Sequence, residues 1–169
     1  MAFYSFVEYL KYSWKAKGRH GTHSPFVYEF VEQVLMEKGA LDQSRLIAAS
    51  FMELKYENLM TRIAAHYNYN NDSIRYGTDL SLLNTPFDML IINEQDAGKW
   101  VGIFEQHLPW LNRNGTVVVT HIHKTKNNTA AWQKMLKHPG VPMSIDLFDM
   151  GILFFREDFK EKQHFVLKY

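Results

Sequence analysis

Four histidines lie at two places in the sequence where short spacing could bring imidazole rings together. His20 and His23 are three residues apart between glycines, and His121 and His123 are two residues apart after an apolar stretch. Alternate residues of a strand share a face, so His121 and His123 would point into one crevice if a strand ran through them. Adding His20 or His23 would complete a three-histidine site suited to zinc or another borderline metal. The alternative is that these histidines are loop residues with ordinary hydrogen bonds, which we favour because such short patterns are weak evidence of a metal site.

A second group of polar residues follows the apolar run 87–92. Asn93, Glu94 and Asp96 stand together there, and a carboxylate at the end of a strand could serve as a general base. The alternative is that Asp96 caps a helix beginning at Ala97, with Glu94 exposed in the loop. We favour the capping interpretation.

The segment from Gly18 to Ser24 is polar and lies directly before Pro25. A serine hydroxyl caps free backbone N–H groups, and proline suits the first position of a helix, so a helix is predicted to begin at Pro25. The polar side chains of this loop would also suit an anion at the helix N-terminus, among them Arg19 and Thr22. Capping is the interpretation that we favour.

Elements of two kinds must position these residues. Before residue 70, apolar residues recur at helical spacing and predict three helices, over residues 3–14, from Pro25 to about Gly39, and from Asp42 to about His66. We expect this N-terminal segment, residues 1–70, to pack on a sheet formed by residues 71–169. The apolar face of the first helix, which includes Trp14, is therefore expected to be buried.

Beyond residue 70, short strands alternate with helices. Strands are predicted at 73–76, 87–93, 116–122, 143–148, 151–156 and 164–169, and helices at 96–112 and 127–138. Strand and helix alternation with short loops predicts a mostly parallel sheet with right-handed crossovers. The last strands follow too closely for a crossover, so the sheet should end in an antiparallel hairpin. The sequence thus predicts an α/β protein with about five to six strands.

Composition excludes several functions. The chain has 169 residues with 19 basic and 18 acidic side chains, so it has no net positive field to attract nucleic acid or an anionic membrane. It contains no cysteine, which excludes disulfides and thiolate metal sites. No apolar run is long enough to span a bilayer, and no signal peptide is evident. We therefore expect a soluble, cytoplasmic protein that binds neither nucleic acid nor membrane.

Several of these segments resemble known ones. Residues 87–93 resemble the fourth strand of a class I S-adenosylmethionine-dependent methyltransferase, residues 115–119 its fifth strand, and residues 144–156 its closing hairpin. Residues 18–27 and 162–165 are similar to a methyltransferase-like family found in Bacteroidetes. The resemblance covers roughly residues 12–40 and 72–169, and it implies a truncated Rossmann-like methyltransferase sheet.

The departures from this family concern its cofactor site. The resemblance implies a glycine-rich turn after the first strand, and only its beginning is present, as Gly77, Thr78 and Asp79. Nine residues separate Gly77 from Phe87, where the family has two further strands and their helices. A single βαβ unit needs about 30 residues, so the parts that hold the ribose and adenine are missing.

Residues later in the sequence, at positions of the family's cofactor and metal sites, differ from the family as well. Arg75 and Asn93 stand where the family has acidic residues, and Thr120 and His121 replace an acidic pair that binds Mg²⁺ in metal-dependent relatives. Magnesium prefers carboxylate oxygens, so these residues would form a poor site.

Three functions remain open. The first, which we favour, is a degenerate methyltransferase-like protein that no longer binds S-adenosylmethionine and acts as an interaction or structural protein. The second is a methyltransferase that completes its site through a partner chain, and the third is a metal-binding protein built on the histidines. In the first case the strand from Ile74 to Gly77 would be an exposed edge, covered by the helix from Asp42 to His66, or paired with a second copy or another protein.

Overall fold

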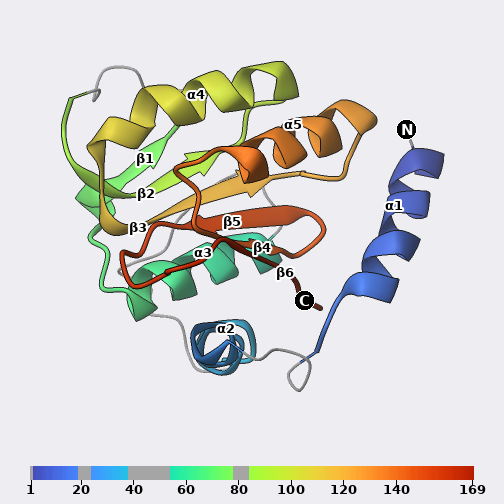
Figure 1. The fold of residues 1–169 in the computed structure, drawn as a ribbon, viewed down its shortest axis with the longest axis horizontal. Helices are drawn as coiled ribbons and strands as arrows, with labels where there is room; N and C mark the ends of the chain where they lie inside the picture. Colours follow the sequence, from blue (N-terminus) through green and yellow to red (C-terminus); the bar gives the residue numbers. More distant parts are fainter. Residues whose placement is uncertain (1, 19–23, 38–53, 78–83) are drawn as a thin grey trace.

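The computed structural model describes residues 2–18, 24–37, 54–77 and 84–169, and these form one open sheet with helices on both faces (Figure 1). The strands are β1 (Ile74–Tyr76), β2 (Phe87–Ile92), β3 (Leu111–Thr120), β4 (Met143–Asp146), β5 (Met150–Phe154) and β6 (Gln163–Val166). Their order in the sheet is β1-β2-β3-β5-β4-β6. The predicted α/β class is confirmed.

Parallel pairing dominates the sheet. β1, β2 and β3 are parallel neighbours, as are β4 and β6, and only β5 runs antiparallel to both of its neighbours, β3 and β4. The predicted antiparallel hairpin is therefore β4–β5. It turns within three residues, and Phe148 at its tip has a φ of 72°. Because β3 and β4 both oppose β5, the carboxyl ends of β1 to β4 lie at one edge of the sheet.

Two helical layers cover the sheet. One face packs against α2 (Pro25–Phe30), its π-helical continuation η2 (Val31–Leu35), and α3 (Leu54–His66). The other face packs against α4 (Trp100–His107) and α5 (Lys126–Lys137). Short 3₁₀ turns complete the chain: η4 (Asn71–Ser73), η5 (Ala97–Lys99) and η6 (Leu108–Trp110). Residues of β2 alternate between the two cores, which explains the continuous apolar run there.

Side-chain caps begin three of these helical segments. Ser24 Oγ accepts a hydrogen bond from the Val27 amide at 3.5 Å, and Asp96 Oδ1 accepts one from the Gly98 amide at 3.0 Å. Thr125 Oγ1 accepts one from Asn128 N at 3.1 Å. The predicted caps at Ser24 and Asp96 are confirmed.

Some predicted boundaries are wrong. β3 ends at Thr120 and not at residue 122, because His121 adopts a φ of 58° and its N–H donates to the Asp149 carbonyl in a turn. The helix expected over 96–112 is an α-helix only from Trp100 to His107, and β3 already begins at Leu111. The described part of the long third helix, α3, packs on a face of the sheet, and residues 42–53 lie outside the described residues.

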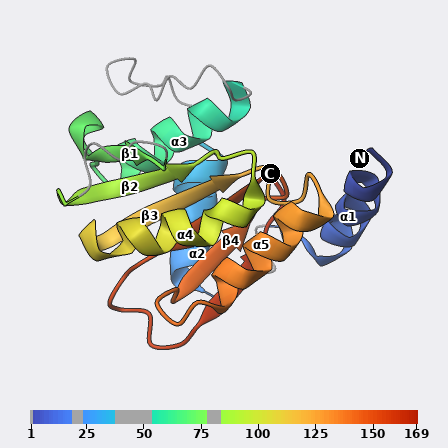
Figure 2. The same ribbon diagram turned by 90° about the horizontal axis from the view of Figure 1, so that it is seen from above.

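The first helix, α1 (Ala2–Lys15), forms where predicted, but its apolar face is not buried. Figures 1 and 2 show α1 beside the end of the sheet, outside both helical layers. Trp14 is 91% exposed, so the expectation that it packs in the core is wrong. The helix is attached through its other side, where Tyr12 and Ala16 are buried.

Candidate functional site

The carboxyl ends of four strands place polar residues at one edge of the sheet. Gly77 follows β1, Asn93 follows β2, His121 follows β3, and Asp146 is the last residue of β4. Open α/β sheets bind ligands at this edge. The pockets at this edge include one at the ends of β1 and β2 and one at the end of β4.

The pocket at the ends of β1 and β2 has a volume of about 320 Å³. It is lined by Tyr76, Gly77, Ile91, Ile92, Asn93, Glu94 and Ile103. The Gly77 amide is already used, since it donates to the Ile91 carbonyl at 2.9 Å. A Cβ at Gly77 would lie 2.7 Å from Ile103 Cγ2, so the space beside this glycine is filled by the chain's own side chain.

The polar residues of this pocket are engaged in local structure. Asn93 Oδ1 accepts a hydrogen bond from the Thr120 hydroxyl, which joins the ends of β2 and β3. Glu94 Oε1 accepts the Asp96 amide at 3.0 Å, and Glu94 Oε2 lies 3.8 Å from Lys99 Nζ. These contacts favour structural roles for Asn93 and Glu94 over that of a general base. Thr78 and Asp79, which complete the vestigial turn, lie outside the described residues.

The two histidines after β3 have different surroundings. His121 lies in a turn, where its carbonyl accepts the Asn128 side-chain amide at 2.9 Å. His123 is buried, and its Nε2 lies 2.8 Å from Asp146 Oδ2. The alternation of a strand does not apply to them because β3 has ended at Thr120.

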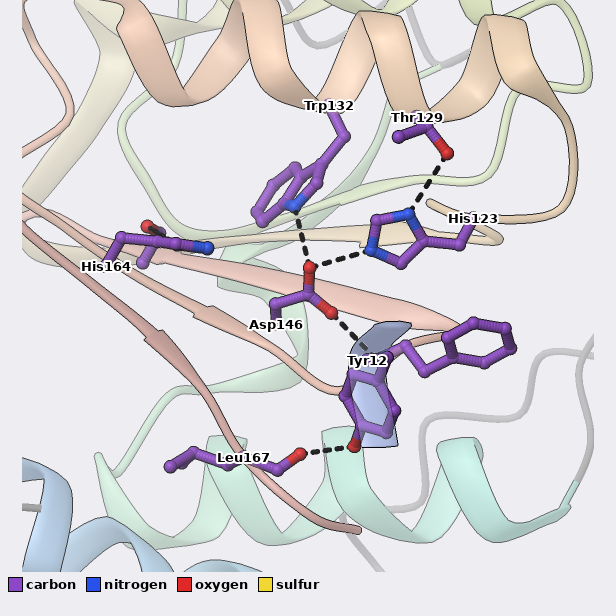
Figure 3. A network of polar contacts seen from close by, with 9 residues as sticks. Tyr12, His123, Thr129, Trp132, Asp146, His164 and Leu167 are labelled. Carbon is purple, nitrogen blue, oxygen red and sulfur yellow. Dashed lines mark hydrogen bonds and ion pairs between the residues drawn. The ribbon is translucent and has the colours of Figure 1, made fainter. Parts of the chain in front are cut away.

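Asp146 is the centre of a buried polar network, shown in Figure 3. Besides His123, its carboxylate accepts hydrogen bonds from Trp132 Nε1 at 3.3 Å and from the Phe148 amide at 2.9 Å. A carboxylate only accepts hydrogen bonds, so the His123 proton belongs on Nε2. Nδ1 of the same ring lies 3.1 Å from the Thr129 hydroxyl. The result is a chain of hydroxyl, imidazole and carboxylate in which each group has a partner.

A small pocket of about 120 Å³ lies beside this network, between α1, α5 and the ends of β4 and β6. His164 lines it, and its Nδ1 lies 2.8 Å from Ser144 Oγ. Burial lowers the pKa of His164, the nearby Asp146 opposes this shift, and the charges of His123 and Lys15 add to it. Chemically, these groups offer hydrogen bonds to a small polar molecule.

The metal hypothesis receives no geometric support from the described residues. Among residues 2–18, 24–37, 54–77 and 84–169, no group of three histidine, aspartate or glutamate side chains is arranged to hold a metal ion. His20 and His23 lie outside these ranges. His123 has a protein partner at both ring nitrogens.

Sequence reasoning did not identify Asp146, Thr129 or Trp132 as parts of a site. The one signal was an acidic residue inside the predicted strand 143–148, whose other residues are apolar except for Ser144. A charged side chain in such a run needs a buried partner. The partner itself, His123, is 23 residues away in the sequence, and no local pattern connects the two.

The fold defines the class of protein to which this chain belongs: open-sheet, Rossmann-like α/β proteins. Comparison with known proteins does not assign the chain to a family, because no family model matches it and no curated protein matches it significantly. Within the described residues, every helix is too short or too polar to cross a membrane. Any assignment of function must therefore come from the geometry.

Proposed function

We propose that this chain is an interaction or structural protein built on a methyltransferase-like sheet that no longer binds S-adenosylmethionine. One observation carries the proposal. β1 and β2 are parallel neighbours, yet only the ten residues 77–86 connect them. A parallel connection usually takes a dozen or more residues and a helix. So short a link is what remains if the strands and helices between the family's first and fourth strands are missing.

The residues at the sheet edge do not fit the cofactor that the resemblance implies. S-adenosylmethionine would need open backbone at Gly77 for its methionine part and an acidic group for its ribose hydroxyls. Ile103 occupies the space at Gly77, and the Glu94 carboxylate is held by the Asp96 amide and Lys99. The pocket volume of about 320 Å³ is also at the lower limit of small-molecule sites.

The β1 edge of the sheet is the surface through which we propose that the chain interacts with a partner. Within the described residues β1 pairs with no strand other than β2, and this edge of the sheet is the surface that we propose for a protein partner or a second copy. The Arg75 guanidinium donates to the Asp72 and Ile74 carbonyls and to Thr85 Oγ1 at 3.3 Å. A charged side chain along an edge limits indiscriminate pairing, so a specific partner is favoured over aggregation.

Calorimetric titration of the purified chain with S-adenosylmethionine tests the proposal against the active-methyltransferase alternative. We expect no heat of binding at high cofactor concentration. Binding of micromolar strength would overturn the proposal. If such binding appeared, loss of affinity in Ile103→Trp, which would fill the pocket at Gly77, would locate it at the family's site.

The metal-binding alternative is tested separately by elemental analysis of protein purified without a histidine tag. We expect substoichiometric metal, since both ring nitrogens of His123 are engaged within the protein. One equivalent of zinc that is lost in His121→Ala would favour the metal-binding function instead.

A further inference from the structure

The apolar face of α1 is the largest set of exposed apolar side chains on one described helix. Phe3 is 81% exposed, Phe6 58%, Leu10 46% and Trp14 91%. Their spacing of three, four and four residues places them on one side of the helix. Monomeric proteins seldom expose a contiguous apolar patch of this kind, and such a patch marks a surface that binds something.

This face has a fixed orientation because the opposite side of α1 is anchored. The Tyr12 hydroxyl donates to the Leu167 carbonyl, and the Tyr9 ring meets Phe148 edge-on at 5.1 Å between centroids. The Lys17 amide donates to the Val166 carbonyl at 2.8 Å, and the Lys168 amide donates to the Lys17 carbonyl at 3.2 Å. The helix is thus held beside β6, outside the two helical layers (Figure 2), and the side chains of its apolar face are exposed.

We propose that a second copy of this chain covers the face, with the two α1 helices packed antiparallel about a two-fold axis. A two-fold interface requires a surface that complements itself. In an antiparallel pair centred between Phe6 and Leu10, Phe3 meets Trp14 of the second copy and Phe6 meets its Leu10. Each large side chain then has an apolar partner, and the spacing is that of the seam between two helices.

Charge favours the same arrangement. The charged residues of α1 lie away from this seam: Glu8, Lys11 and Lys15 line the small pocket beside Asp146, and Lys11 Nζ lies 2.7 Å from Glu8 Oε1. Packing two copies along the seam of Phe3, Phe6, Leu10 and Trp14 therefore buries no charged side chain within the seam. The chain's net charge of only +1 leaves little repulsion between copies and little attraction to an anionic membrane. A second copy is therefore favoured over a lipid surface.

The available area sets the expected strength. Aromatic side chains bury about 150–250 Å² each, so covering these faces in both copies removes on the order of 1,000 Å² from water. That area is at the lower limit of specific interfaces. The dimer should consequently dissociate in the micromolar range.

Sedimentation velocity and light scattering over a micromolar concentration series test the dimer. We expect the mass to rise from 19.9 kDa towards twice that value. Leu10→Glu should weaken the dimer about tenfold or more, because it places a charge at the centre of the seam. Met36→Glu is the matched control, since Met36 is exposed to a similar degree but lies outside α1, and it should leave the dimer intact. Unchanged thermal unfolding of both variants shows that they fold.

Disulfide trapping tests the direction of the helices. The chain has no cysteine, so only introduced thiols can react. A mixture of Phe3→Cys and Trp14→Cys chains should form mainly the mixed disulfide, because these two positions face each other in an antiparallel pair, whereas a parallel pair would give disulfides within each variant alone.

Three outcomes overturn the proposal: a monomer at every concentration, a dimer that Leu10→Glu leaves unchanged, and binding to phosphatidylserine vesicles that Leu10→Glu abolishes in a monomeric chain. The last would show that lipid covers the face. A second copy of the chain would be the partner in the interaction role proposed above, so this inference rests on that proposed function. Its failure remains distinguishable, because the cofactor titration decides the loss of S-adenosylmethionine binding and the measured mass decides the dimer.

Discussion

Asp146 is the residue on which most of the buried polar structure depends. Its carboxylate accepts hydrogen bonds from an imidazole, an indole and a backbone amide, and these come from three separate segments. A buried polar network is stable only when each member has a partner. Removal of the carboxylate therefore affects more than one interaction.

Asp146→Ala should lower the free energy of unfolding by about 3–5 kcal/mol, because it leaves a buried imidazole and indole without their acceptor. Urea denaturation followed by tryptophan fluorescence measures the change. Asp158→Ala is the control: Asp158 forms an exposed ion pair with Arg156 at 2.9 Å, and such pairs contribute little. Equal losses in the two variants would contradict a structural role for the Asp146 network.

Tyr69 should make the protein sensitive to alkali. Burial raises the pKa of Tyr69 to about 12 from an ordinary value of 10.0, and its hydroxyl donates to the Asn114 carbonyl at 2.7 Å. The unfolded chain therefore loses this proton first. The contribution of Tyr69 to stability is complete below pH 10 and disappears as the pH rises towards 12.

Tyr69→Phe should reduce the free energy of unfolding by about 1 kcal/mol at pH 7, through loss of the hydrogen bond. It should also make the decline between pH 10 and pH 12 less steep. Denaturation curves at several pH values measure both effects. Tyr9→Phe, at a tyrosine that is 50% exposed, is the control for the loss of a more accessible hydroxyl, and an unaltered alkaline slope in Tyr69→Phe would contradict the assignment.

Individual site residues were predictable only where the signal was local. Ser24 and Asp96 were recognised as caps because a cap acts on amides two or three residues away. The pairing of His123 with Asp146 depends on the path of the chain across the sheet, which no spacing reveals. The assumed common face of His121 and His123 failed because the strand ends one residue before them.

At the scale of elements, two glycines offer opposite tests of helix and sheet packing. Gly102 lies in α4, and a Cβ there would meet nothing within 4 Å. A Cβ at Gly151 in β5 would lie 2.6 Å from the ring of Trp132. The close approach of α5 to the sheet therefore requires glycine at position 151 but not at position 102.

Gly102→Ala should raise the free energy of unfolding by about 0.5–1 kcal/mol, since alanine restricts the unfolded chain and favours a helix. Gly151→Ala should lower it by about 1–3 kcal/mol through overpacking against Trp132. Chemical denaturation of the two variants in parallel tests both signs. A stabilised Gly151→Ala variant would show that α5 can move away from the sheet at little cost.

The first helix shows what periodicity can and cannot predict about an element. The spacing of Phe3, Phe6, Leu10 and Trp14 correctly identified a helix and the side on which its apolar residues lie. Periodicity does not state what covers that side. The anchoring contacts come from Tyr9, Tyr12 and Ala16 and from the main chain near Lys17, none of which belongs to the predicted apolar stripe.

For the whole molecule, the short connection between β1 and β2 links the fold to the proposed function. The sequence predicted all six strands, and it has only nine residues between Gly77 and Phe87, where the resemblance implied two further strands. The sequence could not show that the strands on either side of this short segment pair directly. In the structure they do, in register from Ile74 with Met89 to Tyr76 with Ile91, and β1 is the last strand of the described sheet on this side.

This arrangement separates two possible interfaces, the edge of β1 and the apolar face of α1, and hydrogen exchange distinguishes them. If the dimer forms through α1, amides of Ala2–Lys15 should gain protection as the concentration rises, because pairing suppresses fraying of the helix. The amides of Ile74–Tyr76, in a short strand that pairs with β2 alone among the described strands, should exchange at rates that do not depend on concentration. Leu10→Glu should remove the concentration dependence in α1 and leave β1 as it was. Protection that rises in β1 and not in α1 would instead place the second copy at the sheet edge, with main-chain hydrogen bonds between strands holding the two chains together.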